Sequence, residues 1–479
     1  MGIRKVSEQL DWQGKRVTVA GLGVSGIPAA RVLHGLGAVV TVVNDGDDER
    51  SRAQAAELEA VGITVRLGDG ATLPPGTELI VTAPGWKPDK PLFLAAEAAG
   101  VEIWGDVELA WRLRGPDAAP WLAVTGTNGK TTTVRMLASI LEAAGLRTAA
   151  VGNIGVSLLD AVLGDEEYDV LAVELSSYQL HWAPSLRAHS AAVLNLAPDH
   201  LDWHGSMDAY AADKGRIYEG NRIACVYNAA DKATEDLVRE ADVEEGCRAI
   251  GFTLGTPGPS QLGVVDDLLV DRAFVADRQK NAQELAQVSD VQPPAPHNVA
   301  NALAAAALAR AFGVEPKAVR EGLRAFRPDP HRIELVEEIQ GVTYVDDSKA
   351  TNTHAAEASL AAYDPIVWIA GGLAKGATFD ELVQGSAKRL RGVVLIGQDR
   401  ALIAEALARH APEVPVVDLD RTDTGAMSAA VREAAALARP GDTVLLAPAC
   451  ASMDMFANYN KRGEAFADAV RALAATGDA

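Results

Sequence analysis

The stretch WLAVTGTNGKTTT, residues 121–133, gives the most specific structural prediction in this chain. WLAVT is a short apolar run typical of a buried parallel strand, and the residues after it indicate a turn into a helix. In a phosphate-binding loop, backbone N–H groups surround the phosphates, Lys130 reaches the β and γ oxygens, and the Thr131 hydroxyl binds Mg²⁺. The strict motif fails at Val124, where its first glycine belongs. The alternative is a glycine-rich helix start without a ligand, which the lysine and three threonines disfavour.

Polar residues follow two later strands of the same α/β series. Glu174 ends VLAVE (170–174), and DHLDWH (199–204) comes after AAVLN (191–195). The carboxyl ends of parallel strands meet at one edge of a sheet, where α/β proteins hold their ligands. Glu174 is therefore a candidate second Mg²⁺ ligand, although it could also be a helix cap. His200 is either a metal ligand or a hydrogen-bonded loop residue, and two histidines do not make a zinc site.

Toward the N-terminus, GLGVSG (21–26) follows the strand RVTVA (16–20) and opens a helix. Its glycines permit close backbone approach, and a helix N-terminus offers N–H groups to a diphosphate. Asp45 lies about twenty positions further on, where an acid commonly binds a ribose hydroxyl. The motif does not distinguish NAD from another nucleotide diphosphate, and a tight turn without a ligand is also open.

Two segments in the second half carry candidate nucleotide contacts. HNVAN (297–301) opens an Ala-rich helix, and Asn298 and Asn301 lie three apart on one face. Their amides could bind an adenine edge, whereas helix capping would account for only one of them. Arg332, in the Pro-containing segment PDPHR, is either a phosphoryl ligand at a domain junction or a solvated linker residue.

Three further segments follow predicted strands near the C-terminus. DDSKATN (346–352) starts a helix, and its Asp347 could bind ribose hydroxyls or water. GGLAKG (371–376) places a lysine on a glycine-rich turn that suits a carboxylate. In PACASMDMFANY (448–459), we expect Ser452 at a helix start. Each segment alone could be a cap or a turn, but their shared position at strand ends predicts a cleft.

The order of these segments predicts three consecutive α/β domains with mostly parallel sheets. RGPDAAP (114–120) and FRPDPHR (326–332) are turn-rich breaks between them. We expect an N-terminal Rossmann-like domain over 1–117, a central P-loop ATPase domain over 118–327 and a C-terminal Rossmann-like domain over 328–479.

Length and charge restrict the function further. A chain of 479 residues is long enough for about three domains, and its net charge of −21 argues against nucleic acid and anionic membranes as partners. We find no run of spanning length and no export signal, and the three cysteines have neither disulfide nor zinc spacing. A cytoplasmic enzyme without membrane insertion is expected.

Together the motifs resemble the Mur ligase family, in the order expected and across all three predicted domains. The resemblance rests on GTNGKTT, NIG (153–155), VELSSYQL (173–180), NLAPDHLDWHGS (195–206), HNVAN, HR, DDSKATN and APACASMD (447–454). Within the family, GLGVSG combined with GTNGKT is most similar to the members that add D-glutamate. The resemblance implies a monomer that uses ATP and two Mg²⁺ ions to join D-glutamate to UDP-N-acetylmuramoyl-L-alanine through an acyl phosphate.

The resemblance also implies roles for single residues. ATP would contact Gly126, Thr127, Asn128, Gly129, Lys130, Thr131, Thr132, Asn298, Asn301, Arg332 and Asp347. Metal ligands would be Thr131, Glu174, His200 and, as a carbamate, Lys214. The UDP substrate would contact Gly23, Val24, Ser25, Gly26, Asp45, Asn153 and His200. D-Glutamate would contact Thr351, Lys375, Ser452 and Tyr459, and the catalytic residues would be Lys130, His200, Lys214, Arg332 and Lys349.

Three rival functions remain to be compared with this one. Folylpolyglutamate synthetase is similar but lacks a nucleotide domain ahead of the phosphate loop. An NAD-dependent oxidoreductase would explain GLGVSG and not GTNGKT, and a P-loop regulatory protein would leave the C-terminal motifs unexplained. Ala83, Val151 and Tyr459 depart from the family pattern, which affects individual substrate contacts.

Overall fold

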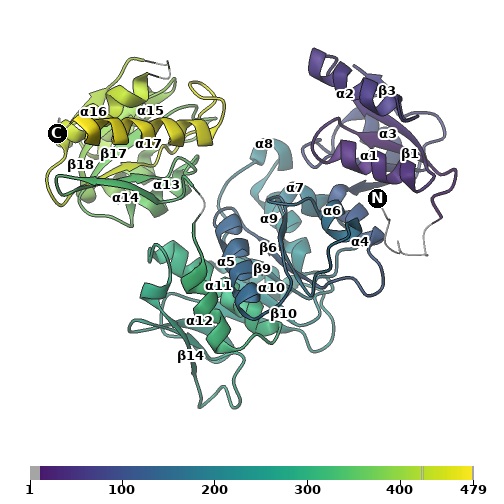
Figure 1. Ribbon diagram of the computed structural model, residues 1–479, viewed down its shortest axis with the longest axis horizontal. Helices are drawn as coiled ribbons and strands as arrows, with labels where there is room; N and C mark the ends of the chain where they lie inside the picture. Colours follow the sequence, from purple (N-terminus) through teal and green to yellow (C-terminus); the bar gives the residue numbers. More distant parts are fainter. Residues whose placement is uncertain (1–10, 329, 422, 424, 477–479) are drawn as a thin grey trace. The chain divides into compact units, whose positions relative to one another are not determined.

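Three β-sheets flanked by helices form the framework of this computed structural model, which describes residues 11–328, 330–421, 423 and 425–476 (Figure 1). The first two sheets belong to one unit, residues 1–291 and 299–326, and the third to a second unit, residues 292–298 and 327–479. The mixed α/β class and the mostly parallel sheets expected from the sequence are confirmed. None of the helices in the described part of the chain is both long and apolar enough to cross a bilayer.

The first sheet has the order β3-β2-β1-β4-β5, and all of its pairings are parallel. Its strands are β1 (Arg16–Ala20), β2 (Val39–Asn44), β3 (Thr64–Leu67), β4 (Leu79–Thr82) and β5 (Glu102–Gly105). Its helices are α1 (Gly26–Gly35), α2 (Glu49–Glu59), α3 (Pro91–Ala98) and α4 (Asp106–Leu113). Strand β1 was expected from RVTVA, whereas nothing indicated β3, because TVRL mixes a charged residue into a very short run.

The second sheet has nine strands in the order β14-β13-β12-β11-β10-β9-β6-β8-β7. Its strands are β6 (Trp121–Thr125), β7 (Ala150–Gly152), β8 (Leu171–Glu174), β9 (Ser190–Val193), β10 (Ala224–Asn228), β11 (Arg248–Phe252), β12 (Gln261–Val265), β13 (Leu268–Asp271) and β14 (Gln283–Gln287). The helices are α5 (Lys130–Ala143), α6 (Leu158–Leu163), α7 (Ser177–His181), α8 (Leu201–His204), α9 (Met207–Gly215), α10 (Lys232–Glu240), α11 (Pro296–Ala311) and α12 (Pro316–Ala325), with 3-10 turns η1 (Arg216–Tyr218) and η2 (Val288–Asp290).

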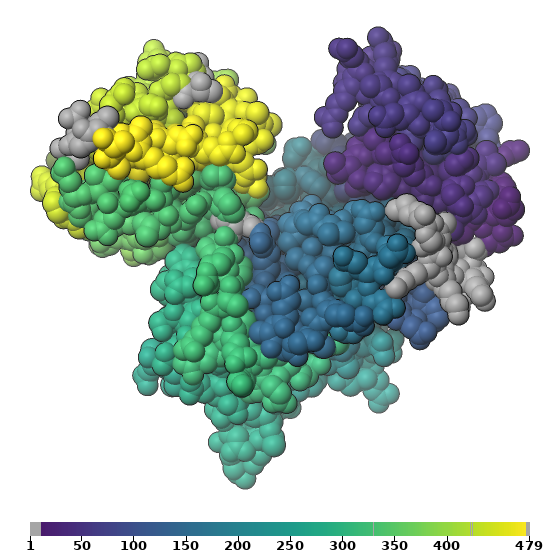
Figure 2. All heavy atoms as spheres, in the orientation of Figure 1, coloured from purple at the N-terminus to yellow at the C-terminus, as the bar shows by residue number. Residues whose placement is uncertain are grey.

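An antiparallel extension at one edge of this sheet was not expected from the sequence. Strands β12, β13 and β14 pair antiparallel, whereas β12 pairs parallel with β11. In Figure 2 the teal-green atoms of this region project from the first unit at the lower end of the view. The extension does not alter the parallel centre, where β6 lies between β9 and β8.

Helix α5, which begins in the phosphate-loop motif, is held by close contact with α12. Ser139 Oγ donates to the Gly322 carbonyl at 2.8 Å. A Cβ at Gly322 would lie only 2.4 Å from the Ile140 Cα, so only glycine permits this approach. The C-terminal half of α5 is therefore held against α12 by close backbone packing.

The third sheet has the order β15-β16-β20-β17-β18-β19, parallel except for the β15–β16 pair. Its strands are β15 (Glu334–Ile339), β16 (Val342–Asp346), β17 (Ile366–Gly371), β18 (Leu390–Ile396), β19 (Val416–Asp418) and β20 (Thr443–Leu446). The helices are α13 (Thr353–Leu360), α14 (Asp380–Ser386), α15 (Arg400–His410), α16 (Ala426–Leu437) and α17 (Tyr459–Thr476), with the 3-10 turn η3 (Ala387–Arg389). Because β16, β20 and β17 are neighbours, their carboxyl-terminal loops lie together.

Candidate active site

The loop after β6 has the backbone of a phosphate-binding turn. Gly126 and Gly129 have positive φ values of 153° and 83°, which L side chains rarely adopt. Lys130 begins α5, and its Nζ donates to the carbonyls of Gly126 and Thr127, both at 2.9 Å. Its ammonium therefore lies over the loop, as a phosphate-binding lysine requires. The predicted contacts Thr131 and Thr132 occupy the first turn of the same helix.

Two residues that the sequence analysis did not single out hold this loop in place. Asn195 Oδ1 accepts from the Asn128 backbone N–H at 2.8 Å, and Asn195 Nδ2 donates to the Asn128 carbonyl at 3.1 Å. The Tyr210 hydroxyl lies 3.0 Å from Thr127 Oγ1. Asn195 is the first residue of the segment NLAPDHLDWHGS (195–206), which contributes to the family resemblance. Nothing in the sequence indicated that its side chain holds the phosphate loop.

Glu174 lies at the end of β8, next to the phosphate loop in the sheet, and is 2% exposed. Its Oε1 accepts from Asn153 Nδ2 at 2.9 Å, which brings together two residues that we predicted separately. Its Oε2 is buried and has no hydrogen-bond partner among the described residues. A buried carboxylate oxygen without a partner costs free energy unless something binds it, and a hard divalent cation is a suitable ligand.

Lys214 is also brought to this edge, from α9. It is 1% exposed, and its Nζ lies 2.9 Å from the Gly126 carbonyl and 3.4 Å from Thr125 Oγ1. Burial lowers its pKa well below the usual range, and the positive charge of Lys130 lowers it further. The lowered pKa makes the neutral amine, which is the nucleophilic form, easier to reach than in an exposed lysine.

His200 takes the left-handed backbone conformation, with φ of 53°, at the start of α8. Its ring lies 4.9 Å from that of Tyr178, and Nε2 lies 3.5 Å from Asp199 Oδ2. Partial burial lowers the pKa of His200, and the charges of Lys130 and Lys214 act in the same direction. The neutral ring is the form that binds metals.

These groups fit the divalent ion that the family resemblance implies. The buried Glu174 Oε2 has no hydrogen-bond partner among the described residues, and the Lys214 Nζ lies 2.9 Å from the Gly126 carbonyl of the loop. The residues that would hold the ion are Thr131, Glu174, His200 and carbamylated Lys214. A separate cluster in the C-terminal unit has closely spaced ligand atoms on His331, Glu334 and Asp346.

Asn301, in α11, packs directly against the phosphate loop. A Cβ at Gly129 would lie 2.4 Å from Asn301 Oδ1, and Asn301 is 7% exposed. Asn298 is also buried, and its Nδ2 donates to the Pro293 carbonyl at 3.2 Å. The structure thus assigns one amide to the loop surroundings and one to the chain before the helix, and their contacts with adenine stay a prediction.

The N-terminal turn has different surroundings. Gly21 has φ of 105°, and Gly23 and Val24 are exposed. Ser25 Oγ donates to Asp106 Oδ2 at 2.9 Å, and Gly26 begins α1. Burial raises the pKa of Asp106, a residue that no motif indicated.

Asp45, at the other side of this turn, forms an ion pair with Lys90 at 2.5 Å. The Lys90 ammonium also lies 4.6 Å from the centre of the Trp86 ring, which contacts Gly21. The acid that was expected to bind a ligand is thus held next to an aromatic face, and 55% of its side chain is exposed. Lys90 and Trp86 carried no recognisable sequence signal.

In the C-terminal unit, the loops after β16, β17 and β20 bring together predicted amino-acid contacts. Lys349 Nζ lies 4.0 Å from the centre of the Tyr459 ring. The Thr351 backbone N–H donates to the Lys349 carbonyl at 2.8 Å. Leu373 exchanges backbone hydrogen bonds with Ala451, so the turn that carries the exposed Lys375 lies beside Ser452.

The expectation for Ser452 was partly wrong. Ser452 is 4% exposed and lies in a turn, whereas the following helix, α17, begins only at Tyr459. Residues between them form successive turns instead of a helix, as in the Met455 N–H bond to the Ser452 carbonyl at 3.0 Å. The Pro, Ser, Asp and Asn residues of this segment favour turns more than its apolar residues suggested.

Arg462 connects the loops that follow β16 and β20, and the sequence analysis did not single it out. It is 1% exposed, and it donates to Ser348 Oγ at 3.0 Å, to the Ser348 carbonyl at 2.9 Å and to the Cys450 carbonyl at 3.0 Å. A single buried guanidinium thus joins the loop after β16 to the loop after β20. Burial lowers its pKa to about 10, so it remains charged at neutral pH.

Asp347 is buried, and burial raises its pKa to about 6. Its carboxylate accepts a hydrogen bond from Ser359, and the nearby charge of Arg332 opposes the shift. The predicted pair Arg332 and Asp347 is therefore close in space. His331, in the left-handed conformation, pairs with Asp346 at 2.7 Å and fixes the chain just before Arg332.

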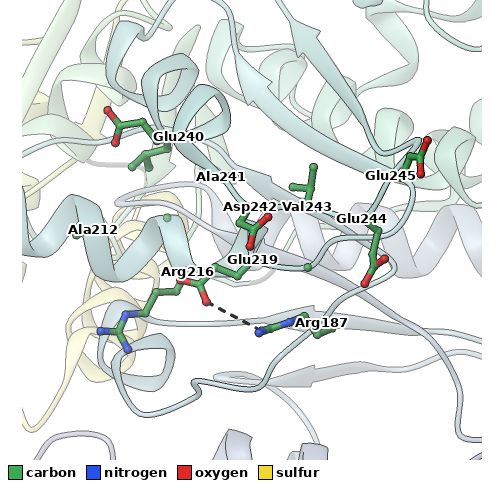
Figure 3. Close-up of a pocket in the computed structure, with 13 residues that line it drawn as sticks. Arg187, Ala212, Arg216, Glu219, Glu240, Ala241, Asp242, Val243, Glu244 and Glu245 are labelled. Atoms are coloured by element: carbon green, nitrogen blue, oxygen red, sulfur yellow. Dashed lines mark ion pairs between the residues drawn. The ribbon is translucent and has the colours of Figure 1, made fainter.

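A pocket of about 730 Å³ opens beside α9 and α10 (Figure 3). Figure 3 shows Arg187 and Glu219 pointing toward one another across it, with Glu240, Glu244 and Glu245 around the rim. None of the site residues predicted from the sequence lines this pocket. It borders the back of α9, whose other side carries Lys214.

Comparison with known proteins identifies the family. The Mur ligase middle domain matches residues 124–309, and the Mur ligase glutamate ligase domain matches residues 331–450. The chain belongs to the Mur ligase family. It is 86% identical to the UDP-N-acetylmuramoylalanine--D-glutamate ligase of Streptomyces avermitilis over 465 residues, covering 97% of this chain and 100% of that one. It is 60% identical to the enzyme of the same name from Thermobifida fusca, with coverages of 97% and 100%.

Solved Mur ligases share the fold. The UDP-N-acetylmuramate-alanine ligase of Thermotoga maritima has a TM-score of 0.55 at 18% identity, covering 96% of this chain and 99% of that one. A MurF ligase of Thermotoga maritima, solved in complex with ADP, has a TM-score of 0.55 at 16% identity, with 96% of both chains covered. At such low identity these likenesses support the Mur ligase architecture alone.

Proposed function

We propose that this Mur ligase joins D-glutamate to UDP-N-acetylmuramoyl-L-alanine at the expense of ATP, as a step of peptidoglycan precursor synthesis. The printed names of relatives 86% and 60% identical over almost their whole length support this assignment. The observation that carries the chemistry is the phosphate loop with Lys130, Glu174 and Lys214 around it. Folylpolyglutamate synthesis would not explain the N-terminal turn at residues 21–26. Dehydrogenation would not explain the phosphate loop at residues 126–131.

The reaction requires activation of a carboxylate, because a carboxylate is a poor acyl electrophile. The L-alanyl carboxylate attacks the γ-phosphorus of ATP, its new O–P bond forms, and the bond to the β-phosphate oxygen breaks to release ADP. Lys130 and Arg332 offset the negative charge that is transferred. The D-glutamate nitrogen then attacks the acyl carbon and loses a proton to a base, phosphate leaves with the C–O bond electrons, and an amide remains.

Two Mg²⁺ ions are proposed as cofactors, and bound Mg²⁺ would neutralise phosphate charge during transfer. Thr131 and Glu174 would hold one ion, and His200 with carbamylated Lys214 would hold the other. The neutral Lys214 amine can attack CO₂, forming an N–C bond and releasing a proton to solvent. The product supplies oxygen ligands, which Mg²⁺ prefers and an ammonium could not provide.

Substrate recognition is divided among the three sheets. The turn at Gly23–Gly26 and Asp45 would bind the UDP portion, with Asn153 and His200 facing the muramoyl-alanine. Lys375, Thr351, Ser452 and Tyr459 would bind D-glutamate, and Lys349 would face the reacting carboxyl. This division corresponds to domains over 1–117, 118–327 and 328–479, in a monomer of the cytoplasm.

The decisive experiment measures phosphate release from ATP with a panel of amino acids, with and without UDP-N-acetylmuramoyl-L-alanine. Release is expected only with D-glutamate and the nucleotide substrate together, and Mg²⁺ should be required. Phosphate release that depends on a folate substrate, or on another amino acid, would contradict the assignment.

Lys375→Ala tests the amino-acid site within that assay. Because one charge-assisted hydrogen bond contributes about 1.5–3 kcal/mol, the KM for D-glutamate should rise about ten- to hundredfold. The KM for ATP should stay within about twofold of wild type. Lys388→Ala, which changes a lysine of the same unit that carries no predicted role, is the matched control. Equal increases in both KM values would assign Lys375 to a structural or phosphate-binding role.

A further inference from the structure

Asp213 joins three helices through its buried carboxylate. The carboxylate is 2.9 Å from His181 Nδ1 on α7 and 2.9 Å from His204 Nδ1 on α8. Asp213 itself lies on α9 and is 6% exposed. A carboxylate only accepts hydrogen bonds, so both Nδ1 atoms carry hydrogen and donate to it.

The network extends beyond the carboxylate on both sides. His204 Nε2 lies 3.0 Å from Ser177 Oγ, at the first residue of α7. Arg216 pairs with Asp213 at 3.4 Å and donates to the His181 carbonyl at 2.8 Å. All the polar atoms of the His204 ring are therefore bonded, and its side chain is 0% exposed.

Each helix in the network follows or carries one of the proposed metal ligands. Helix α7 begins three residues after Glu174, α8 is preceded directly by His200, and Lys214 is the neighbour of Asp213 on α9. The three ligands come from separate segments, with no helix or strand in common. Strand β8 fixes Glu174 in the sheet, so the positions of His200 and Lys214 relative to it depend on contacts that join α8 and α9 to α7.

A serine, a histidine and an aspartate in sequence also form the triad of acyl-transfer enzymes. Ser177 is only 3% exposed and begins a helix packed inside the unit, so its oxygen is inaccessible to a substrate carbonyl. The His204 ring is enclosed too, stacked on Tyr178 with an interplanar angle of 7°. The arrangement suits a rigid support and not a nucleophile.

We propose that Asp213 is a positioning residue that sets the geometry of Glu174, His200 and Lys214 by connecting α7, α8 and α9 through His181, His204 and Ser177. This role rests on the proposed Mg²⁺ site. Ligand oxygens and nitrogens must be held to within about 0.5 Å for productive metal binding. Loss of a supporting partner typically weakens metal affinity about ten- to hundredfold.

The test is direct binding of Mn²⁺, followed by electron paramagnetic resonance, to the full chain in the presence of ADP. Asp213→Asn keeps the size of the side chain but leaves one oxygen to accept from two histidines, and its Mn²⁺ affinity should fall about ten- to hundredfold. Asp208→Asn is the matched control, because Asp208 is an exposed acid on the same helix. It should bind Mn²⁺ as wild type does.

A second readout follows Lys214 itself. With ¹³C-labelled bicarbonate, the carbamate signal of Lys214 should be visible by NMR in wild type and in Asp208→Asn. The signal should be weaker in Asp213→Asn. In steady-state assays, the Mg²⁺ concentration for half-maximal rate should rise in Asp213→Asn, while the KM for D-glutamate at saturating Mg²⁺ stays within about twofold.

The outcomes separate this role from its premise. Glu174→Gln should lose Mn²⁺ affinity, and a wild-type affinity in that variant would overturn the metal site and this role of Asp213 together. Weak binding in Glu174→Gln with wild-type binding in Asp213→Asn would overturn the positioning role alone. If Asp213→Asn does not fold, Ser177→Ala takes its place, because it removes one oxygen and should weaken Mn²⁺ binding in the same direction. Wild-type Mn²⁺ affinity in Ser177→Ala would then overturn the proposal.

Discussion

The first unit contains two glycine-rich turns that each join a parallel strand to a helix, and different polar groups lie at the two helix starts. At residues 126–129 the Lys130 ammonium lies over the loop carbonyls. At residues 21–26 the side chain nearest the helix start, Ser25, donates to the carboxylate of Asp106. The backbone arrangement is shared, but the electrostatic surroundings are not.

This difference explains why the two motifs carry unequal information. Helix N-termini and glycine backbones attract phosphate in either turn. A triphosphate that undergoes transfer also needs a cation and a metal ligand, and Lys130 and Glu174 are the residues proposed for these roles at the second turn. A diphosphate that is only held needs neither, so the first turn can have an acid behind it.

The largest expected difference between the turns concerns their lysines. Lys130→Ala should lower the rate of ATP turnover about a hundred- to thousandfold, because a transition-state charge loses its partner. Lys90→Ala, near the first turn, should change only the KM for the nucleotide-sugar substrate. Phosphate release at saturating ATP and a circular dichroism spectrum for folding measure both. Near-normal ATP turnover in Lys130→Ala would contradict the proposal that the second turn binds the phosphates of ATP.

A smaller effect is expected from adding a methyl group to each turn. Gly129→Ala forces a Cβ onto a residue with φ of 83° and to 2.4 Å from Asn301 Oδ1. Left-handed backbone costs about 1–2 kcal/mol for a residue with a Cβ, so the KM for ATP should rise about tenfold. A Cβ at Gly23 would meet nothing within 4 Å, so Gly23→Ala should unfold at the wild-type temperature. Equal ATP kinetics in both variants would show that the second turn tolerates a side chain.

Ligand choice at the first turn is the next test. UDP should bind about tenfold more tightly than NAD, a difference of about 1.4 kcal/mol. Isothermal titration of the full Lys130→Ala chain with UDP, NAD and NADP separates this site from the ATP site. Tight NAD binding without detectable UDP binding would revive the oxidoreductase function.

The smallest expected effect concerns Asp106. Burial raises its pKa in the folded protein, so folding binds protons and stability falls as pH rises from the unfolded pKa through the folded one. Asp106→Asn cannot ionise, so it avoids this fall in stability, and its unfolding temperature at pH 7 should be slightly higher than that of wild type. The advantage over wild type should disappear as the pH is lowered below 4. An unchanged difference across this pH range would mean that Asp106 is not destabilised by burial.

Much of the fold was predictable because its central strands are short apolar runs. RVTVA and WLAVT each form the expected strand, and the breaks near residues 114–120 and 326–332 lie between elements. The antiparallel edge of the second sheet was not predictable, because its strands mix polar and apolar residues in runs of four or five. Strands of that kind are selected by their neighbours more than by their own sequence.

The candidate site shows the same division. Residues such as Lys130 and Glu174 could be proposed from the sequence, because a loop motif or a strand end marks their places. Asp213 and Arg462 were missed, because their contacts include residues of other segments, His181 for Asp213 and Ser348 for Arg462. No local pattern distinguishes a buried supporting arginine from one on a solvated helix, so only the tertiary structure reveals them.

Arg462 also bears on how the amino-acid specificity of this enzyme could be changed. Two of its three hydrogen bonds end on backbone carbonyls, those of Ser348 and Cys450. The frame of the loops therefore depends little on which side chains the loops display. Directed evolution could vary Lys349, Lys375 and Ser452 together while the anchoring arginine is kept constant. Libraries built in this way would search new acceptor amino acids on a scaffold that stays folded.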